Sequence, residues 1–501
     1  MFGSNPEVSH FFNILLYFLS SVLLFFILQK IFPNIHILFS VIVVTLFIAH
    51  PIHTEVVASL KNRDEILSFI FSLLTLFYTI KLGETKKKVY FFPIVVFFLV
   101  ALLSKQSAMV YAAVCPMVLL FLPKKTNIKS ILILFSLLVA AYLMMKLIEK
   151  GLISKNVRDK FFWDNPLYFY KSYAIRSATG MMTLLFYAKI LIFPHPLLFY
   201  YGYDMIPISN WNNIWIILIL LLHLALFVFA VYLFRKKNPI GFGILYYLIA
   251  ISMFTNIVRS AAGIVAERYA YSAVLGFCIV IAGILFAIFK VIHVKEISRS
   301  KKLIMGILVF LILLPYSYKT ISRNTDWKDY NALYAHDIKY LEKSAKANEL
   351  YASELDRQVN EDMLKTKDLD KNMPKIKLCI KHFEQSLKID SSNSMANNNL
   401  GLIYFVLFRD NKKALTYFKK SIQFDPEYGR GNFNMALVYE NSKDFDSAIV
   451  YYQKVNKIDP GNQNAFINQA NIYFNEKHDL DKAIEISKKF SETDPENALP
   501  Y

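Results

Sequence analysis

Ten apolar runs fill most of residues 1–318 of the 501-residue chain, and they restrict its fold more than any other feature. A helix needs about 20 largely apolar residues to cross the ~30 Å hydrocarbon core of a bilayer. Inside that core each backbone polar group must be bonded within the protein, so the runs predict a bundle of membrane helices. The predicted spans are residues 11–29, 35–49, 64–81, 89–103, 107–122, 128–147, 212–234, 239–257, 269–290 and 303–318.

The charge distribution divides the chain into two parts. Residues 319–501 carry 27 Lys and Arg against 27 Asp and Glu, so the whole formal net charge of +18 belongs to residues 1–318. A basic surplus in an apolar segment is typical of cytoplasmic loops beside anionic lipid, and nucleic-acid binding is not expected. The three cysteines offer neither a disulfide framework nor the spacing of a cysteine-based zinc site.

The basic loops predict the orientation of the membrane helices. The positive-inside rule assigns four of them to the cytoplasm, namely residues 86–88, 124–129, 235–237 and 290–302. Alternation of the spans then places the N-terminus and the remaining polar segments on the opposite, external side, namely residues 50–64, 105–106, 256–267 and all that follow Tyr316.

One apolar segment does not fit this alternation. Met181–Phe193 is short, and a crossing there would invert every later loop. We therefore expect it to be re-entrant or interfacial, within a long external loop over residues 149–211. That loop is either a lid over a lipid-borne ligand or a peripheral flap that seals the bundle.

The polar part of the chain repeats with a period of about 35 residues. Asp390, Asp425, Asp459 and Asp494 follow one another at intervals of 35, 34 and 35, and Pro follows each of the last three. Small residues recur at Gly401, Ala436 and Ala470, each with Tyr three positions later. This pattern is typical of the tetratricopeptide repeat, a stack of helix pairs with a concave groove.

The predicted fold is therefore all-α, with a polytopic helical membrane domain followed by a tetratricopeptide-repeat α-solenoid. We place the membrane domain at residues 1–318, a junction at 319–347 and the repeat domain at 348–501. Residues 348–374 enlarge the first repeat as either a loop or a longer helix.

A cluster of titratable groups in His50–Glu55 and Lys61–Glu65 is the main candidate site. Such groups at the mouth of a membrane segment usually face a cavity or pair with one another, because burying them in lipid is costly. Glu55 and Asp64 are the candidate general bases, and His53 is an alternative base or positioning group, with His50 beside it. The competing interpretation is a helix entrance decorated with charges, where the helix dipole favours Glu55. No metal is predicted, because Pro51 turns His50 away from a helical pair with His53.

Four cationic side chains occur at helix boundaries on the predicted external side. They could form a cradle for a phosphate or pyrophosphate group, and they are Arg63, Lys105, Arg259 and Arg268. Gln106 and Glu267 lie next to two of them, and Glu267 could equally neutralise Arg268 at the interface. No Gly-rich phosphate loop is present, so a soluble nucleotide is not expected.

Together these segments resemble the transmembrane and tetratricopeptide-repeat O-mannosyltransferase family of C-type glycosyltransferases over nearly the whole chain. The resemblance rests on residues 50–57 with Arg63-Asp64, on Ser104-Lys105-Gln106, on Ala266-Glu267-Arg268 with Tyr271, and on Arg323-Asn324 with Trp327. It implies transfer of mannose, or a related sugar, from a polyprenyl or dolichyl phosphate to protein Ser or Thr on the non-cytoplasmic face. The partners implied are membrane lipids, the lipid-linked sugar and an acceptor polypeptide held by the repeats, with no other cofactor.

The chain departs from the family pattern in two places. The family often has Lys-Glu where this chain has Lys105-Gln106. Members also begin with a further membrane helix and an external loop that carries the acidic catalytic base, and this chain starts at Met1 where that loop should be ending. The expectations left open are an absent upstream segment, an inactive relative, or a local acid in that role.

Two other functions compete with this one. A membrane-anchored repeat scaffold without catalysis explains the repeats, but it gives no reason for ten spans. A polyprenyl-linked glycan ligase would share the donor and differ in the acceptor. The Lys-, Asn- and Ile-rich composition favours a bacterial inner membrane over the endoplasmic reticulum, with the repeats on the non-cytoplasmic side.

Overall fold

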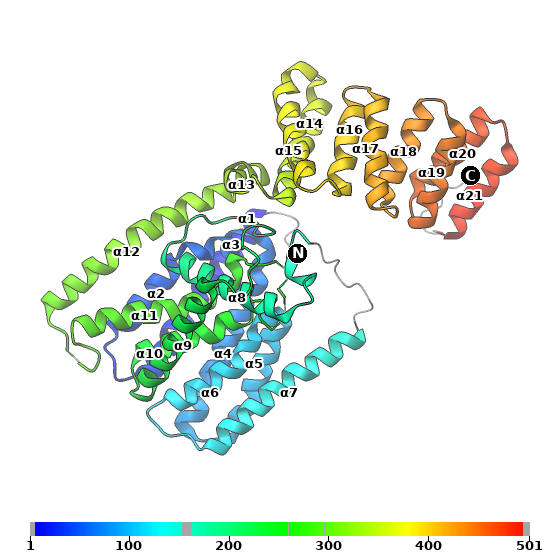
Figure 1. The fold of residues 1–501 in the computed structure, drawn as a ribbon. Coiled ribbons are helices and arrows are strands. Elements are labelled where there is room, and N and C mark those ends of the chain that lie inside the picture. The colour runs from blue at the N-terminus through cyan, green and yellow to red at the C-terminus, as the bar shows by residue number, and fades with distance from the viewer. Residues whose placement is uncertain (1–5, 153–161, 259, 262, 295, 494–501) are drawn as a thin grey trace. The chain divides into compact units, whose positions relative to one another are not determined.

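The computed structural model describes residues 6–152, 162–258, 260–261, 263–294 and 296–493. Over these residues the backbone forms helices and turns, and no strand occurs among them, so the predicted all-α class is confirmed (Figure 1). The chain divides into two compact units, Met1–Leu333 and Tyr334–Tyr501. The division falls inside the stretch expected as the junction.

The first unit contains the predicted membrane spans as helices. Its elements are α1 (Pro6–Ile31), α2 (Leu38–Ala49), η1 (Pro51–His53), α3 (Thr54–Ala58), η2 (Leu60–Asn62), α4 (Arg63–Thr85), η3 (Lys88–Tyr90), α5 (Phe91–Ser104), η4 (Gln106–Val110), α6 (Tyr111–Phe121), α7 (Ile128–Leu152), η5 (Pro166–Tyr168), α8 (Tyr173–Ile192), α9 (Ile214–Arg235), α10 (Pro239–Ser252), η6 (Glu267–Ala270), α11 (Ala273–Ile288) and α12 (Arg299–Asp326). Within the described ranges, six helices are long and apolar enough to cross a membrane, or seven if the bent pair Leu38–Ala49 and Pro51–Ala58 is one span. Four of the predicted spans are shorter helices of 10–17 residues.

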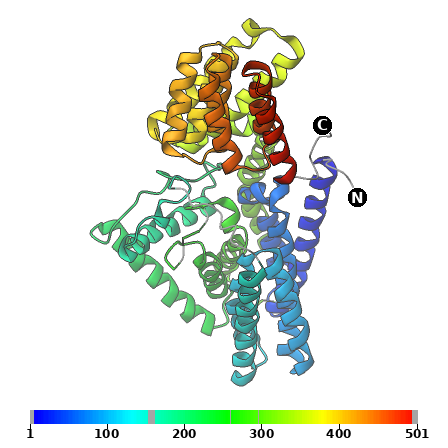
Figure 2. The ribbon, with the colours of Figure 1, turned by 90° about the vertical axis from the view of Figure 1, so that its right-hand side faces the viewer.

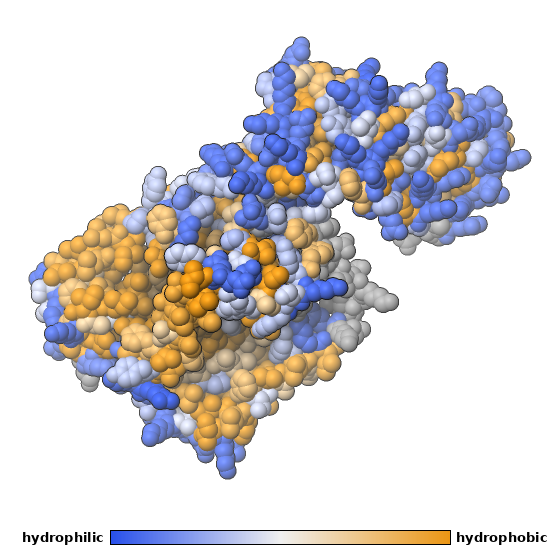
Figure 3. Space-filling model, viewed as in Figure 1, coloured by the Kyte–Doolittle hydropathy of each residue, from blue (hydrophilic) through white to orange (hydrophobic). Residues whose placement is uncertain are grey.

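The surface of this unit is apolar where a soluble protein would be polar. In α9 and α12 only 17% of the most apolar window is buried, although its hydropathy is high, whereas in α4 the share is 61%. Figure 3 shows broad hydrophobic areas over this unit and a hydrophilic surface over the repeat unit. Large exposed apolar areas mark contact with a membrane or partner, and their distribution over several long helices makes this unit a multi-pass membrane domain.

Three of the four predicted basic loops lie together at one end of the bundle, as the charge pattern predicts. The Nζ of Lys86 donates to the carbonyl of Lys125 at 2.8 Å, and the Nζ of Lys237 donates to the carbonyl of Leu120 at 2.5 Å. Helix α4 separates this end from the candidate site, because Glu65 lies in its first turn and Lys86 caps its last. At 1.5 Å per residue its 23 residues span about 35 Å, the thickness of a bilayer core.

The expectation of a short apolar segment at 181–193 is wrong. The structure has a 20-residue helix there, α8, which is long and apolar enough to cross a membrane. The first two turns of this helix were not recognised in the sequence because they contain the polar residues Arg176, Ser177 and Thr179. A helix accommodates such residues when neighbouring segments form hydrogen bonds with them.

Both ends of α8 nevertheless bond to segments assigned to the external side. The indole of Trp211 donates to Ser177 at 3.1 Å near one end, and the imidazole of His50 donates to the carbonyl of Leu191 at 2.9 Å near the other. These contacts favour a helix that lies along the external surface.

Close packing of α10 on α11 depends on two glycines. A Cβ added at Gly276 would lie 2.6 Å from the carbonyl oxygen of Gly243, and one at Gly243 would lie 2.8 Å from that of Gly276. Helix α1 packs beside α4 in the same bundle (Figure 2). Small residues of this kind let helix backbones approach closely in membranes.

The second unit is a stack of helix pairs. Its helices are α14 (Ala345–Thr366), α15 (Leu369–Ile389), α16 (Ser394–Val406), α17 (Asn411–Phe424), α18 (Gly429–Asn441), α19 (Phe445–Ile458), α20 (Gln463–Asn471) with the π-helical turn η8 (Ile472–Glu476), and α21 (Leu480–Thr493). The helix α13 (Tyr330–Asp337) crosses the division between the two units, and the turn η7 (Ile338–Tyr340) precedes the first helix pair. Residues 348–374, expected to form either a loop or a longer helix, are mostly helical. Helix α14 continues to Thr366, and the chain turns at Lys367, whose φ is 51°.

We expect Gly276→Ala to destabilise the membrane unit by about 1–3 kcal/mol, because the added methyl group forces α10 and α11 apart. Thermal unfolding of the purified chain in detergent measures the effect. Gly306→Ala on α12 is the matched control, since no atom lies within 4 Å of its added Cβ. An equal effect of both substitutions would contradict close packing at Gly276.

The repeat unit should become less stable as pH rises from about 4 to about 6. Burial raises the pKa of Asp356 in α14 to about 6 from 3.8, against the hydrogen bond from Asn360, so the native state holds this proton more tightly than the unfolded chain. Asp356→Asn should therefore raise the free energy of unfolding by about 1–3 kcal/mol at pH 7.5 and change it little at pH 4. The unfolding temperature of the two proteins at both pH values measures the effect. A constant difference between the two proteins across this range would contradict the assignment.

Candidate active site

The site begins where α2 ends. His50 has an extended backbone (φ −67°, ψ 122°), and Pro51 starts the next helical turn, so the chain bends by 52° between Leu38–Ala49 and Pro51–Ala58. The Nδ1 atom of His50 accepts the amide of Ile52 at 3.3 Å, and its Nε2 donates to Leu191. His50 is fully buried, so its observed role is to brace this bend.

His53 is enclosed by aromatic rings. Its ring centroid lies 4.4 Å from that of Phe47 and 4.8 Å from that of Tyr271, and its Nδ1 lies 2.7 Å from the hydroxyl of Tyr17. Its exposed fraction is 3%, and its Nε2 has no hydrogen-bond partner among the described residues. The structure thus places His53 in the packed core behind the bend.

Glu55 forms an ion pair with Arg268, 213 residues away in the sequence. The guanidinium of Arg268 lies 2.5 Å from Oε1 of Glu55, and the backbone amide of Arg268 donates to Oε2 at 2.8 Å. Burial alone would lower the pKa of Arg268, but the carboxylate of Glu55 reverses this and raises the pKa above its usual value. Both oxygens of Glu55 are occupied, so Glu55 holds a permanently charged Arg268 in place.

Glu267 does not neutralise Arg268, contrary to one of the two expectations for this pair. Its Oε1 accepts the amide of Leu198 at 2.6 Å and the hydroxyl of Tyr201 at 2.8 Å, on the other side of η6. Burial raises the pKa of Glu267 to about 8, against the positive charge of Arg323. Adjacent residues in the turn therefore face different partners, and Glu267 fixes the loop that follows α8.

A second charged group joins the start of α4 to the break between α5 and η4. The Nζ of Lys105 lies 2.6 Å from Oδ2 of Asp64 and 3.5 Å from Oε1 of Glu65. Burial lowers the pKa of Lys105, but Glu65 and Asp64 together raise it, so the amine stays charged. The charge of Glu65 also acts on Arg268, which places all four groups in one electrostatic cluster.

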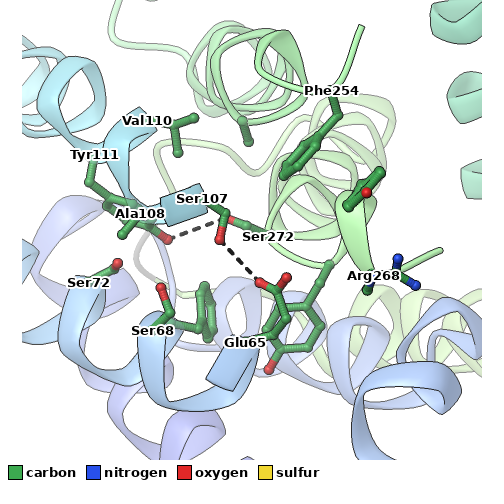
Figure 4. Close-up of a pocket in the computed structure, with 14 residues that line it drawn as sticks. Glu65, Ser68, Ser72, Ser107, Ala108, Val110, Tyr111, Phe254, Arg268 and Ser272 are labelled. Carbon is green, nitrogen blue, oxygen red and sulfur yellow. Dashed lines mark hydrogen bonds between the residues drawn. The ribbon is translucent and has the colours of Figure 1, made fainter. Parts of the chain in front are cut away.

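Figure 4 shows a pocket between α4, η4, α10 and η6 that Glu65 and Arg268 border. Glu65 forms part of its wall and accepts the hydroxyl of Ser107 at 3.1 Å. Ser72 is fully buried, and its hydroxyl has no hydrogen-bond partner among the described residues. Further polar groups in the wall are Ser68, Tyr111, Arg268 and Ser272, and the apolar part includes Phe69, Phe254, Tyr269 and Tyr271. A pocket with several hydroxyls, a carboxylate and a cation can bind a hydroxyl-bearing, anionic ligand.

Glu65 lies in the predicted cluster, but inspection of the sequence did not select it as a candidate base. Its exposed fraction is 5%, whereas the side chain of the predicted base Asp64 is 37% exposed. The available signal was its helical register, since Glu65, Phe69 and Ser72 share one face of α4 at spacings of four and three.

The other predicted site residues have different neighbours. Arg63 donates from Nε to Asn13 and from Nη2 to the carbonyl of Ser9, both at 2.8 Å, and so ties α4 to α1. Gln106 donates to Glu149 at 2.9 Å. Arg259 lies outside the described residues. Among the residues described, no group of three or more His, Cys, Asp or Glu side chains could hold a metal ion.

Comparisons with known proteins agree with this architecture. Residues 429–462 match the tetratricopeptide repeat family. "Protein O-mannosyl-transferase F38B6.6" of Caenorhabditis elegans is 27% identical over 349 residues, which cover 69% of this chain and 46% of that protein. Human "Protein O-mannosyl-transferase TMTC3" is 23% identical over 98% of this chain and 56% of its own length, and human TMTC1 is 25% identical over 82% and 48%.

The fold and site thus define a multi-pass membrane protein that carries tetratricopeptide repeats and a charged pocket at a broken helix. The relatives and the repeat match support the resemblance to a TMTC-like family that was seen in the sequence. The chain spans about half the length of the curated relatives it matches.

We expect Glu55→Gln to lower the free energy of unfolding by about 1–3 kcal/mol, because it leaves the partly buried guanidinium of Arg268 without its counter-charge. The side chain of Arg268 keeps 30% exposure, which reduces the loss. Thermal unfolding in detergent of both single variants and of Glu55→Gln/Arg268→Gln completes a double-mutant cycle. Additive effects of the two substitutions would show that the pair contributes nothing.

Proposed function

We propose that this chain is a membrane glycosyltransferase that moves mannose, or a related sugar, from a polyprenyl phosphate to Ser or Thr of a polypeptide. The observation that carries the proposal is the pocket beside the charged cluster, where the carboxylate of Glu65 lies near two cations that are held by acidic side chains. The relatives named as protein O-mannosyltransferases support the reaction class.

The two cations suit the donor phosphate. Lys105 and Arg268 come from different segments, and Asp64, Glu65 and Glu55 hold them without removing their charge. Preorganised cations stabilise the charge that builds on a leaving phosphate and need no rearrangement during the reaction. A lipid-linked donor can enter sideways from the membrane, so no polar path through the bundle is needed.

Glu65 is the best-placed general base. The acceptor oxygen bonds to the anomeric carbon of the sugar while the bond from that carbon to the phosphate oxygen breaks. The bonding electron pair leaves with polyprenyl phosphate, and the acceptor proton passes to Glu65. Asp64 is more exposed and pairs closely with Lys105, and Glu55 is occupied by Arg268, so these two act as positioning residues.

The external face is the proposed side of the reaction, and a bacterial inner membrane is the proposed location. Three of the four basic loops meet at one end of the bundle, and α4 separates them from the pocket by the thickness of a bilayer core. The repeat unit, which follows α12, would hold the acceptor polypeptide on the same non-cytoplasmic side.

The test is transfer of radiolabelled mannose from polyprenyl-phosphate mannose to a Ser/Thr-containing polypeptide by the purified chain in lipid nanodiscs. Glu65→Gln should lower the transfer rate about 100-fold or more, as removal of a general base does. Arg268→Ala should weaken donor binding and transfer together.

Glu84→Gln is the matched control for Glu65→Gln. Glu84 lies in the last turn of α4 and pairs with Lys30 at 3.6 Å, at the opposite end of the bundle, so transfer should be unchanged. Full transfer activity in Glu65→Gln would exclude Glu65 as the base. If no sugar donor supports transfer while Arg268→Ala retains partner binding, the protein is a scaffold.

A further inference from the structure

Positive charge in the repeat unit is concentrated on the second helices of its first two helix pairs. Helix α15 carries five lysines against two acidic residues, and α17 carries four lysines and no acidic residue. The first helices differ, since α14 carries five acidic residues against three basic ones and α16 carries no charged residue. The balanced charge of residues 319–501 therefore includes a basic surface formed by α15 and α17.

The lysines of α15 face away from the core of the stack. Lys377, Lys381 and Lys388 are exposed and share one face of the helix at spacings of four and seven. Cys379 and Phe383 are buried on the other face. The helix dipole favours lysine near a helix C-terminus, so exposed charge alone does not identify a binding surface.

A groove of about 370 Å³ between α15 and α17 adds a second observation. It stays open because the first helices of successive pairs pack on one another, whereas no comparable packing joins α15 to α17. Lys388 lines it from α15 and Lys420 from α17, and Glu384 is the one acidic residue among those that line it. The two lysines therefore leave the groove positive. The uncharged polar residues of its wall are Ser391, Asn397, Tyr417 and Gln423.

The two lysines of the groove differ from a neighbouring lysine that is already paired. Lys375, also in α15, pairs with Asp362 at 2.8 Å. In the described part of the chain, neither Lys388 nor Lys420 has an acidic partner of this kind. Lys420 lies over the ring of Tyr417, 5.8 Å from its centroid, which directs its amine along the groove wall. Amines without a counter-charge attract phosphate, to which they donate charge-assisted hydrogen bonds.

The apolar part of the groove distinguishes a lipid from other phosphate-bearing or acidic ligands. Leu387 and Phe424 line it beside the lysines, and Phe424 is 45% exposed. Where lysine and an exposed aromatic ring stand together, the amine can meet the phosphates of a bilayer while the ring enters the boundary of the acyl chains. Free phosphate or an acidic peptide would give the ring of Phe424 no such environment.

We propose that the groove between α15 and α17 binds the phosphate of an anionic phospholipid and so attaches the repeat unit to a bilayer surface. Lys388 and Lys420 bind the phosphate oxygens, and Phe424 enters the layer beneath the headgroups. Residues 327–344 alone connect α14 with α12, a helix long and apolar enough to cross a membrane. This short tether keeps the groove at high local concentration beside lipid, so a weak contact is sufficient. The inference rests on the membrane unit and not on the proposed sugar transfer.

The test uses the full chain in nanodiscs of neutral phosphatidylcholine and measures its flotation with phosphatidylcholine vesicles that contain about 30% phosphatidylglycerol. Lys388→Gln/Lys420→Gln should weaken binding about 30-fold, about fivefold for each lysine. Lys388→Arg/Lys420→Arg should retain binding, because arginine keeps the charge. The basic loops of the membrane unit are the same in all variants, so differences between variants report on the groove.

The matched control is Lys365→Gln/Lys443→Gln. Both lysines are exposed and lie at the turns that lead into α15 and α19, at the opposite end of the second helices from the groove. The control removes the same charge from the repeat unit, yet it should weaken binding less than about twofold at about 0.15 M salt, where distant charges are screened. Thermal unfolding identifies any variant whose fold is damaged.

A second arm distinguishes the possible sources of the phosphate. Phe424→Ser should weaken vesicle binding about threefold, because a lipid surface also contacts the ring. Inorganic phosphate and a polyglutamate peptide, each added at the same ionic strength as chloride, should displace the vesicles only weakly, because neither contacts Phe424.

Three results would overturn the proposal. They are vesicle binding unchanged in the folded Lys388→Gln/Lys420→Gln chain, an equal loss in the control pair, and binding of phosphate or polyglutamate through these lysines without binding of vesicles. Vesicle binding that depends on the groove, in a chain that transfers no sugar, would refute the proposed function and keep this inference. Sugar transfer by a chain whose groove does not bind vesicles would refute this inference alone.

Discussion

The ion pair between Glu55 and Arg268 is the interaction on which the site depends. A charge in an apolar bundle is tolerated only when a counter-charge or hydrogen bonds accompany it, and this pair supplies both across 213 residues of sequence. It connects the broken end of α2 with the turn before α11. Without it, the guanidinium that borders the pocket would have neither a fixed position nor a counter-charge.

The same rule explains why the site contains so many acids. Lys105 is held by Asp64 and Glu65, and Glu267 turns away from Arg268 to bind the loop after α8. Each acid removes the cost of a neighbouring cation or of an unsatisfied amide. Glu65 differs from the others because its carboxylate also borders the pocket and bonds Ser107 there. The charged groups around the pocket are thus paired with one another, whereas the hydroxyls of Ser72 and Tyr271 in its wall have no hydrogen-bond partner among the described residues.

Much of the architecture could be predicted from the sequence, because it depends on periodicity and composition. Each predicted span is a helix, the repeats are helix pairs, and three of the four basic loops meet at one end. The exception was α8, because its first turns carry polar residues that lower the hydropathy of the segment. In the structure, Trp211 and other residues bind these polar side chains. Motif spacing also drew attention to Lys105 and Arg268, because charges at the mouths of membrane helices are costly.

What the sequence by itself determined was the class of fold, the repeat period and the set of charged residues available for a site. Only the tertiary structure decided their partners: Arg268 pairs with Glu55 and not with Glu267, Arg63 binds α1, and Glu65 borders the pocket beside the more exposed Asp64. The physical reason is that period and hydropathy act along the chain, whereas an ion pair depends on distance in space. Residues that are neighbours in a turn face opposite directions, and their partners come from helices far away in the sequence.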